Sequence, residues 1–180
     1  TLAVISGRAI LPAFQPTCKG SVLVLSGEDC TEQYLRGLVA LANVHGVPHE
    51  EMDATVKARL HLRAMNPKGF LEADRAGNIS RAPYFEEVRA YSRRVRPVLT
   101  VIDTVRRHFG LPNENDNAAV GAWMQAALDL ATASGGAVLA LHHVSKAADG
   151  REQAALRGGS AFADEARAVW TLTAEGEGLR

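Results

Sequence analysis

The chain has 180 residues, of which 47% are hydrophobic and 22% charged, and its formal net charge is zero. This length and composition suit one domain with a buried core and exclude an intrinsically disordered protein. Zero net charge argues against a monomer that binds nucleic acid non-specifically, although a local basic loop is compatible with it. Cys18 and Cys30 lack the spacing of a metal cluster or disulfide framework, and no apolar run is long enough to cross a membrane. We therefore expect a soluble, cytoplasmic protein.

Both ends of the sequence suggest a chain that continues further. The first residue is Thr1 rather than methionine. An apolar stripe with helical spacing follows it and predicts a helix that Pro12 ends; the stripe consists of Leu2, Ile5 and Ala9. At the other end, residues 175–180 have the pattern expected of a turn, and the sequence stops there. We expect a chain that is cut at both ends.

The first strand is predicted over residues 21–27, a short apolar run that ends in two acids, Glu28 and Asp29. Asp29 and Glu32 have the spacing of a capping box, so we expect Asp29 to begin the next helix. An apolar stripe runs along that helix, and Gly46 is expected to end it.

The middle of the chain combines helical and strand patterns. Residues 50–56 predict a short helix, residues 59–64 alternate like an edge strand, and residues 70–79 suggest a β-hairpin. Pro83 then opens a helix that carries arginines towards its end, namely Arg89, Arg93, Arg94 and Arg96. The helix dipole favours cations in the last turn and accounts for this run. Contact with phosphate is the alternative.

Residues 98–105 are the stretch around which the chain is organised. The run is apolar, rich in β-branched residues and without polar alternation, which predicts a strand buried on both faces. It leads into Asp103 and the hydroxyl of Thr104. An acid at the carboxyl end of a buried parallel strand lies where open α/β sheets bind ligands. This is the geometry of a Walker B strand, although Asp103 could instead simply cap the next turn.

A polar loop is expected over residues 106–117. The longest helix follows, with Asp116 or Asn117 as its cap and Trp123 in its apolar stripe, so Trp123 is predicted to be a core residue. Gly135 marks the end of this helix.

A third buried strand is predicted over residues 137–141 and ends in His142 and His143. The rest of the chain should contain a polar, mobile segment, a tight turn, a helical turn and a fourth buried strand, at residues 145–157, 157–160, 161–164 and 168–172. Four buried strands joined by helices predict a parallel α/β sheet, in which the carboxyl ends of the strands share one edge.

The polar residues at that edge suit phosphoryl transfer. Asp103 would hold Mg²⁺ through water, and Glu28 would orient and deprotonate an attacking water. One histidine could hydrogen-bond a terminal phosphate. His142 and His143 are consecutive, so they point to opposite faces and at most one of them faces the ligand from the strand. For each, a purely structural role is the alternative.

Four motifs together resemble RepA-like hexameric replicative helicases of the RecA-type P-loop ATPases; they lie at residues 25–29, 99–104, 141–146 and 157–160. The resemblance implies one RecA-like domain over residues 1–180, a three-layer α/β sandwich with a mainly parallel sheet. It also implies a homo-hexameric ring that uses ATP and Mg²⁺ and moves along single-stranded DNA. A replication initiator or a primase would be a candidate partner.

The same resemblance assigns roles to individual residues. The catalytic set would be Glu28 as base, Asp103 as Walker B acid and metal ligand, His142 or His143 as γ-phosphate sensor, and Arg157 near the subunit interface. The nucleotide would also contact Thr1, Asp29, Thr104 and Ser160. Residues 144–156 would form the DNA-contacting loop, in which Lys146 and Arg151 would contact the single-stranded DNA.

One departure from that family is clear, because no GxxxxGK[ST] phosphate-binding loop occurs in the chain. We expect that loop directly before Thr1, and a further arginine for the neighbouring subunit's site beyond Arg180. The fragment alone should then bind ATP poorly and hydrolyse little. Three alternatives stay open: a catalytically silent RecA-like module for DNA binding or assembly, a regulatory or recombination ATPase of the same fold, and a metal-dependent phosphoesterase.

Overall fold

The computed structural model describes residues 1–10, 15–64, 68–143 and 161–171. In chain order its elements are α1 (Leu2–Ser6), β1 (Val22–Ser26), α2 (Thr31–Val44), α3 (His49–Arg59), β2 (Leu60–Ala64), β3 (Leu71–Ala73), β4 (Ile79–Arg81), α4 (Pro83–Val95), β5 (Leu99–Asp103), α5 (Val105–Phe109), α6 (Asn117–Ser134), β6 (Ala137–Leu141) and α7 (Ala161–Glu165). Within these ranges, no helix is long and apolar enough to span a membrane.

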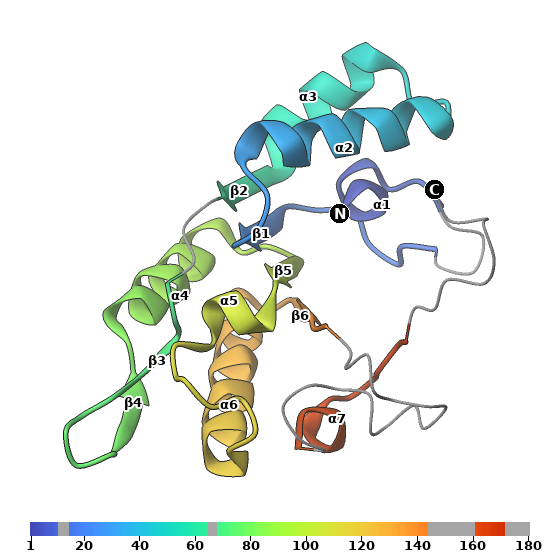
Figure 1. The fold of residues 1–180 in the computed structure, drawn as a ribbon. Helices are drawn as coiled ribbons and strands as arrows, with labels where there is room; N and C mark the ends of the chain where they lie inside the picture. Colours follow the sequence, from blue (N-terminus) through green and yellow to red (C-terminus); the bar gives the residue numbers. More distant parts are fainter. Residues whose placement is uncertain (11–14, 65–67, 144–160, 172–180) are drawn as a thin grey trace.

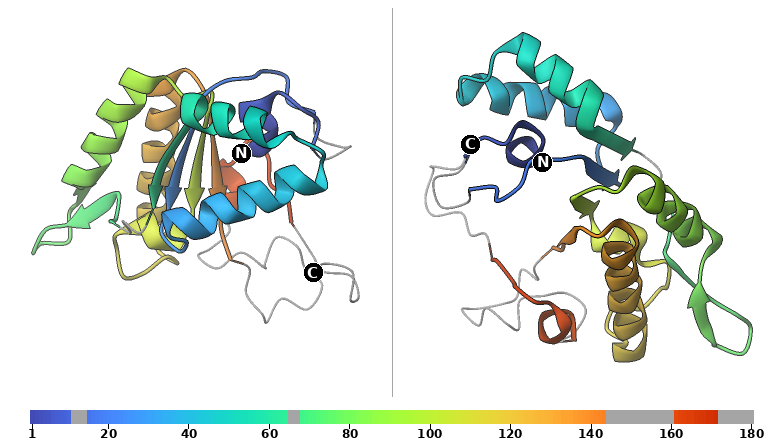
Figure 2. Two further views of the ribbon diagram at one scale, coloured as in Figure 1. Left: turned by 90° about the horizontal axis from the view of Figure 1, so that it is seen from above. Right: turned by 180° about the vertical axis from the view of Figure 1, so that it is seen from behind.

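A parallel sheet of four strands, in the order β2-β1-β5-β6, forms the middle layer of the molecule. Helices α1, α2 and α3 cover one face of the sheet, while α4 and α6 cover the other (Figures 1 and 2). The prediction of an α/β, RecA-like arrangement with a mainly parallel sheet is confirmed. The predicted hairpin is also present, as the antiparallel pair of β3 and β4.

Strand β1 shows why its sequence has no polar alternation. All five of its residues are buried, and successive side chains enter different cores. Leu23 and Leu25 pack against the α4 and α6 layer, whereas Val22 and Val24 pack with Ile5 on the opposite face. A strand with helices on both faces is apolar along most of its length, and in β1 only the last residue, Ser26, is polar.

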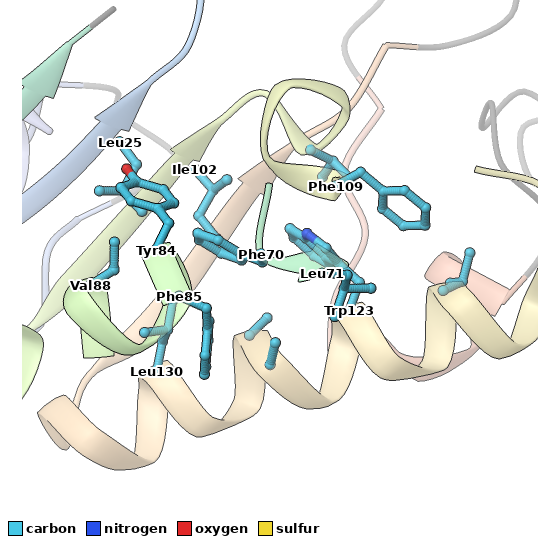
Figure 3. Close-up of a cluster of buried hydrophobic side chains, with 14 of the residues drawn as sticks. Leu25, Phe70, Leu71, Tyr84, Phe85, Val88, Ile102, Phe109, Trp123 and Leu130 are labelled. Atoms are coloured by element: carbon cyan, nitrogen blue, oxygen red, sulfur yellow. The ribbon is translucent and has the colours of Figure 1, made fainter. Parts of the chain in front are cut away.

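Aromatic side chains fill the larger core, between the sheet and the α4 and α6 layer (Figure 3). The rings of Phe70 and Trp123 stack with centroids 6.2 Å apart, and Phe85 meets Phe70 edge-on at 5.5 Å. The indole Nε1–H of Trp123 donates to the carbonyl oxygen of His108 at 3.2 Å, which satisfies the polar atom of a fully buried side chain. Trp123 is therefore a core residue, as predicted.

The connections diverge between the two central strands. From β1 the chain passes through α2 and α3 to β2 on one side, and from β5 it passes through α5 and α6 to β6 on the other. This divergence defines a topological switch point between β1 and β5. In open α/β sheets, ligands bind outside the carboxyl ends of the strands at such a point.

Two predicted helix ends are wrong. Helix α1 ends at Ser6 rather than at Pro12, because Gly7 takes a left-handed conformation with φ of 75°. Helix α2 is capped by Cys30 rather than Asp29: the side-chain oxygen of Gln33 accepts a hydrogen bond from the Cys30 N–H at 3.1 Å.

Three predictions in the second half also need correction. Residues 106–109 of the expected polar loop belong to helix α5. This helix buries Val105 and Phe109, although Arg106 and Arg107 lie between them in the sequence. The fourth strand of the sheet is β2, since residues 168–171 are not a strand. Strand β6 is not buried as predicted, because it forms an edge of the described sheet and three of its five residues are exposed.

Trp123→Ala should lower the free energy of unfolding by about 3–5 kcal/mol, because it removes a large side chain from a closely packed core and leaves a cavity. Chemical denaturation followed by circular dichroism measures this loss. Leu128→Ala on the same helix is the control, since Leu128 is 51% exposed and should change stability by less than about 0.5 kcal/mol. Equal effects of the two variants would contradict the described packing of α6.

Candidate active site

The carboxyl ends of the central strands lie level with one another. Ser26 of β1 is in register with Asp103 of β5, and Asp103 with Leu141 of β6. The polar residues that follow each strand therefore meet at one rim of the sheet, at the switch point. We call this edge the catalytic rim and define it by Glu28, Asp103, Thr104 and His143.

Glu28 is the centre of the contacts at the catalytic rim. The hydroxyl of Thr104 donates to Glu28 Oε1 over 3.4 Å, and His143 Nε2 lies 3.4 Å from the same oxygen. Arg107 Nε from helix α5 lies 3.7 Å from it. Two separate segments, the start of α5 and the residues after β6, therefore place polar groups around one carboxylate, which is the arrangement that a base needs in order to hold a water molecule in place.

Asp103 lies in a strongly negative environment. Burial raises the pKa of its carboxyl group, and the charges of Glu28 and Asp29 raise it further, while His143 opposes the shift. The backbone also holds the two strand ends together, since the Gly27 N–H donates to the Asp103 carbonyl oxygen at 2.5 Å. Carboxylates crowded in this way favour a bound cation.

The side chains at the rim fit Mg²⁺ rather than a metal enclosed by protein. Among the residues that the structure describes, no three His, Cys, Asp or Glu side chains converge closely enough to hold a metal by themselves. Mg²⁺ is commonly bound by one or two carboxylates, with water and substrate phosphates as its other ligands. Asp103, with its neighbouring acids, provides that kind of partial site.

Gly27 allows helix α5 to approach the rim. A Cβ atom at Gly27 would lie 2.5 Å from the Cβ of Arg107, closer than side chains can pack. The absence of a side chain at Gly27 therefore places Arg107 beside Glu28. Sequence reasoning did not identify Arg107 as a site residue; its position four residues after Asp103, in the first turn beyond the strand, is the signal that could have done so.

The two adjacent histidines diverge, as expected of consecutive residues. His143 points to Glu28, but the ring of His142 packs edge-on against Phe162 of α7, with centroids 5.1 Å apart. His142 Nε2 lies 3.8 Å from Glu114 Oε2, and Arg106 binds the other oxygen of Glu114 at 2.7 Å. The structure thus places His143 at the rim and gives His142 a packing position.

Thr1 lies at the entrance to a groove next to the rim. Its hydroxyl forms a 2.7 Å hydrogen bond with the hydroxyl of Tyr34. Burial raises the pKa of Tyr34, the bond to Thr1 opposes this, and the charges of Asp103 and Asp29 raise it further. The groove has a volume of about 320 Å³ and is lined by Thr1, Leu2, Asp29, Gln33, Tyr34, Gly37, Leu38 and Leu41.

Tyr34, in the groove beside the rim, is a second residue that sequence reasoning missed. Its position on α2 gives no local sign of its contact with Thr1, which lies far away in the sequence. The remaining predicted site residues lie outside the described part of the chain, namely Lys146, Arg151, Arg157 and Ser160.

The fold and the rim define a class of protein: α/β proteins that bind a ligand at the switch point of a parallel sheet. Comparison with known families makes this class more specific. A family model described as an AAA domain matches residues 1–149, so the chain belongs to this family of nucleotide-binding ATPase modules. No curated protein matches the chain.

Asp103→Asn should raise the free energy of unfolding at pH 7. The pKa of Asp103 is raised in the folded protein, so ionisation of this carboxyl group opposes folding. The protonated carboxyl group of Asp103 contributes fully to the free energy of unfolding below the pKa that it has in the unfolded chain. This contribution is lost as the pH rises through the raised pKa of the folded protein. The gain from Asn should therefore disappear as the pH is lowered. Urea denaturation over a series of pH values, without Mg²⁺, measures it.

Asp74→Asn is the matched control with the opposite sign. Hydrogen bonds from Asn78 and the turn backbone lower the pKa of Asp74, so its ionised form stabilises the hairpin. This variant should lose stability at pH 7 and match the unchanged protein as the pH falls through the lowered pKa. If both variants changed stability in the same direction at pH 7, the electrostatic description of the rim would be wrong.

Proposed function

We propose that the chain is the core of an ATP-driven motor on single-stranded DNA, of the RepA-like hexameric replicative type. Membership of the AAA domain family supports ATP as the nucleotide. The observation that carries the proposal is the cluster at Glu28, where Thr104 and His143 both lie 3.4 Å from one carboxylate oxygen beside Asp103. The resemblance of the four sequence motifs to those of RepA-like helicases supports a hexameric ring that acts on DNA.

Glu28 is the general base in this mechanism. It accepts a proton from a water molecule, whose oxygen attacks the γ-phosphorus of ATP while the bond to the ADP oxygen breaks. The Thr104 hydroxyl, which donates to Glu28 Oε1, keeps the carboxylate oriented towards that water. Asp103 would hold Mg²⁺, which neutralises phosphate charge when it is bound.

His143 is the residue proposed to detect the γ-phosphate. Its contact with Glu28 links the base to the segment that starts at residue 144, where the DNA-contacting loop is proposed. Loss of the phosphate would change the hydrogen bonding of His143 and so the start of that loop. The ring assembly, with a replication initiator or a primase as partner, belongs to the same proposal.

Glu28→Gln in the full-length protein should lower the kcat of ATP hydrolysis by about 10²- to 10⁴-fold, because the amide cannot accept the proton from water. Binding of ATP should persist, since Gln keeps the shape of the side chain. Steady-state hydrolysis and equilibrium nucleotide binding measure the two effects separately.

Glu32→Gln is the control for this test, because Glu32 lies on the exposed surface of α2 and pairs only with Arg36 in the described structure. It should leave turnover unchanged. Undiminished turnover in Glu28→Gln would remove Glu28 from the mechanism. If the unchanged full-length protein bound no ATP, a silent assembly module would replace the motor.

Lys146→Ala together with Arg151→Ala should weaken binding of single-stranded DNA and flatten its salt dependence. The slope of log K against log salt should fall by about 0.7 for each phosphate that the protein no longer neutralises. Fluorescence anisotropy of a labelled oligonucleotide at several salt concentrations measures that slope. An unaltered slope would place the DNA-binding surface elsewhere.

A further inference from the structure

A positively charged cluster lies at the edge of the sheet formed by β2, next to α4. Its centre is the ring of Tyr91, which holds two guanidinium groups. Arg63 lies 4.5 Å and Arg94 4.9 Å from the ring centroid. The Tyr91 hydroxyl shares a 3.0 Å hydrogen bond with His61 Nδ1. We call these four residues the cation–aromatic cluster.

The helix dipole does not explain this cluster. It accounts for cations in the last turn of α4, such as Arg93 and Arg94. Arg63, however, comes from a different element, the edge strand β2, and packs on the same ring. Two like charges brought together from two elements leave an excess of positive charge at one point.

The two cluster arginines have no ion-pair partner among the described residues. Neither Arg63 nor Arg94 forms an ion pair within the described ranges, whereas the other arginines stacked on α4 rings do: Arg81 pairs with Asp129 and Arg89 with Glu86. Glu87 is exposed one turn before Tyr91 and makes no ion pair with either cluster arginine. A guanidinium group held over a ring keeps its N–H donors, which can bind phosphate oxygens in pairs.

We propose that the cation–aromatic cluster binds the phosphate backbone of single-stranded nucleic acid. Two guanidinium groups on one ring, contributed by two elements, favour a partner with more than one negative charge over a single small anion. Arginine and aromatic side chains on one surface are typical of proteins that bind single strands. The chain's zero net charge makes this a local feature.

The cluster has a defined relation to the catalytic rim. Arg63 is in register with Leu25 of β1, only three residues before Glu28. The cluster therefore lies near the carboxyl end of β2, the same end of the sheet as Glu28. The cation–aromatic cluster would be an additional contact with the single-stranded DNA of the proposed function, and to that extent the inference rests on the proposed function.

The test uses the double variant Arg63→Gln and Arg94→Gln in the full-length protein, with fluorescein-labelled dT20 as the probe. Removing the two guanidinium groups that bind phosphate should reduce the slope of log K against log salt by about 1.4. The control is Arg36→Gln with Lys57→Gln, which removes the same charge from exposed positions on α2 and α3. The control should leave the slope unchanged.

Variants of Tyr91 separate orientation from charge. Tyr91→Phe keeps the ring and should bind dT20 as the unchanged protein does, whereas Tyr91→Leu should bind several-fold more weakly. An unchanged slope in the arginine double variant would overturn the inference. Equal competition by polyglutamate and unlabelled dT20 would also overturn it, and would indicate an acidic protein partner instead.

Hydrolysis of ATP without DNA, measured on the same variants, separates this inference from the proposed function. The double variant should keep the basal rate. If that rate is normal and the salt slope is unaltered, the cluster inference fails while the motor proposal stands. If no nucleotide is bound but the slope still falls, the motor proposal fails and the cluster inference stands.

Discussion

The site is governed by one electrostatic constraint, the crowding of acidic side chains where β1 and β5 end side by side. The register of these strands brings Glu28 and Asp29 next to Asp103, and burial raises the pKa of Asp103. Such an arrangement opposes folding unless positive charge compensates it. Arg107 supplies part of that charge within the chain. Under the proposed function, a bound Mg²⁺ ion would add further positive charge beside these acids.

Much of the fold could be predicted from local sequence patterns. The apolar runs at β1 and β5 specify buried strands because helices cover both faces, and an acid at the end of each run specifies its position at the sheet edge. The parallel topology then brings these acids together. Glu28, Asp103 and the His142–His143 pair could therefore be grouped without coordinates.

The missed features all depend on packing between distant segments. Nothing local in the sequence shows that Phe162 contacts His142, so the choice between the two histidines needed the structure. Helix α5 was missed because its consecutive arginines give the local sequence the polar character of a loop. Residues 168–171 were predicted to be a strand because they are apolar, but they lie outside the sheet. Tyr34 could not be predicted because its partner, Thr1, is far away in sequence.

We propose that a metal–nucleotide complex binds at the catalytic rim. Paramagnetic broadening of amide NMR signals by Mn²⁺ with ATP tests this binding directly in the full-length protein. We expect strong broadening of Gly27, Asp103 and Thr104, with little effect on the hairpin amides near Asp74. Broadening centred elsewhere, with the signals of β1 and β5 unaffected, would contradict it.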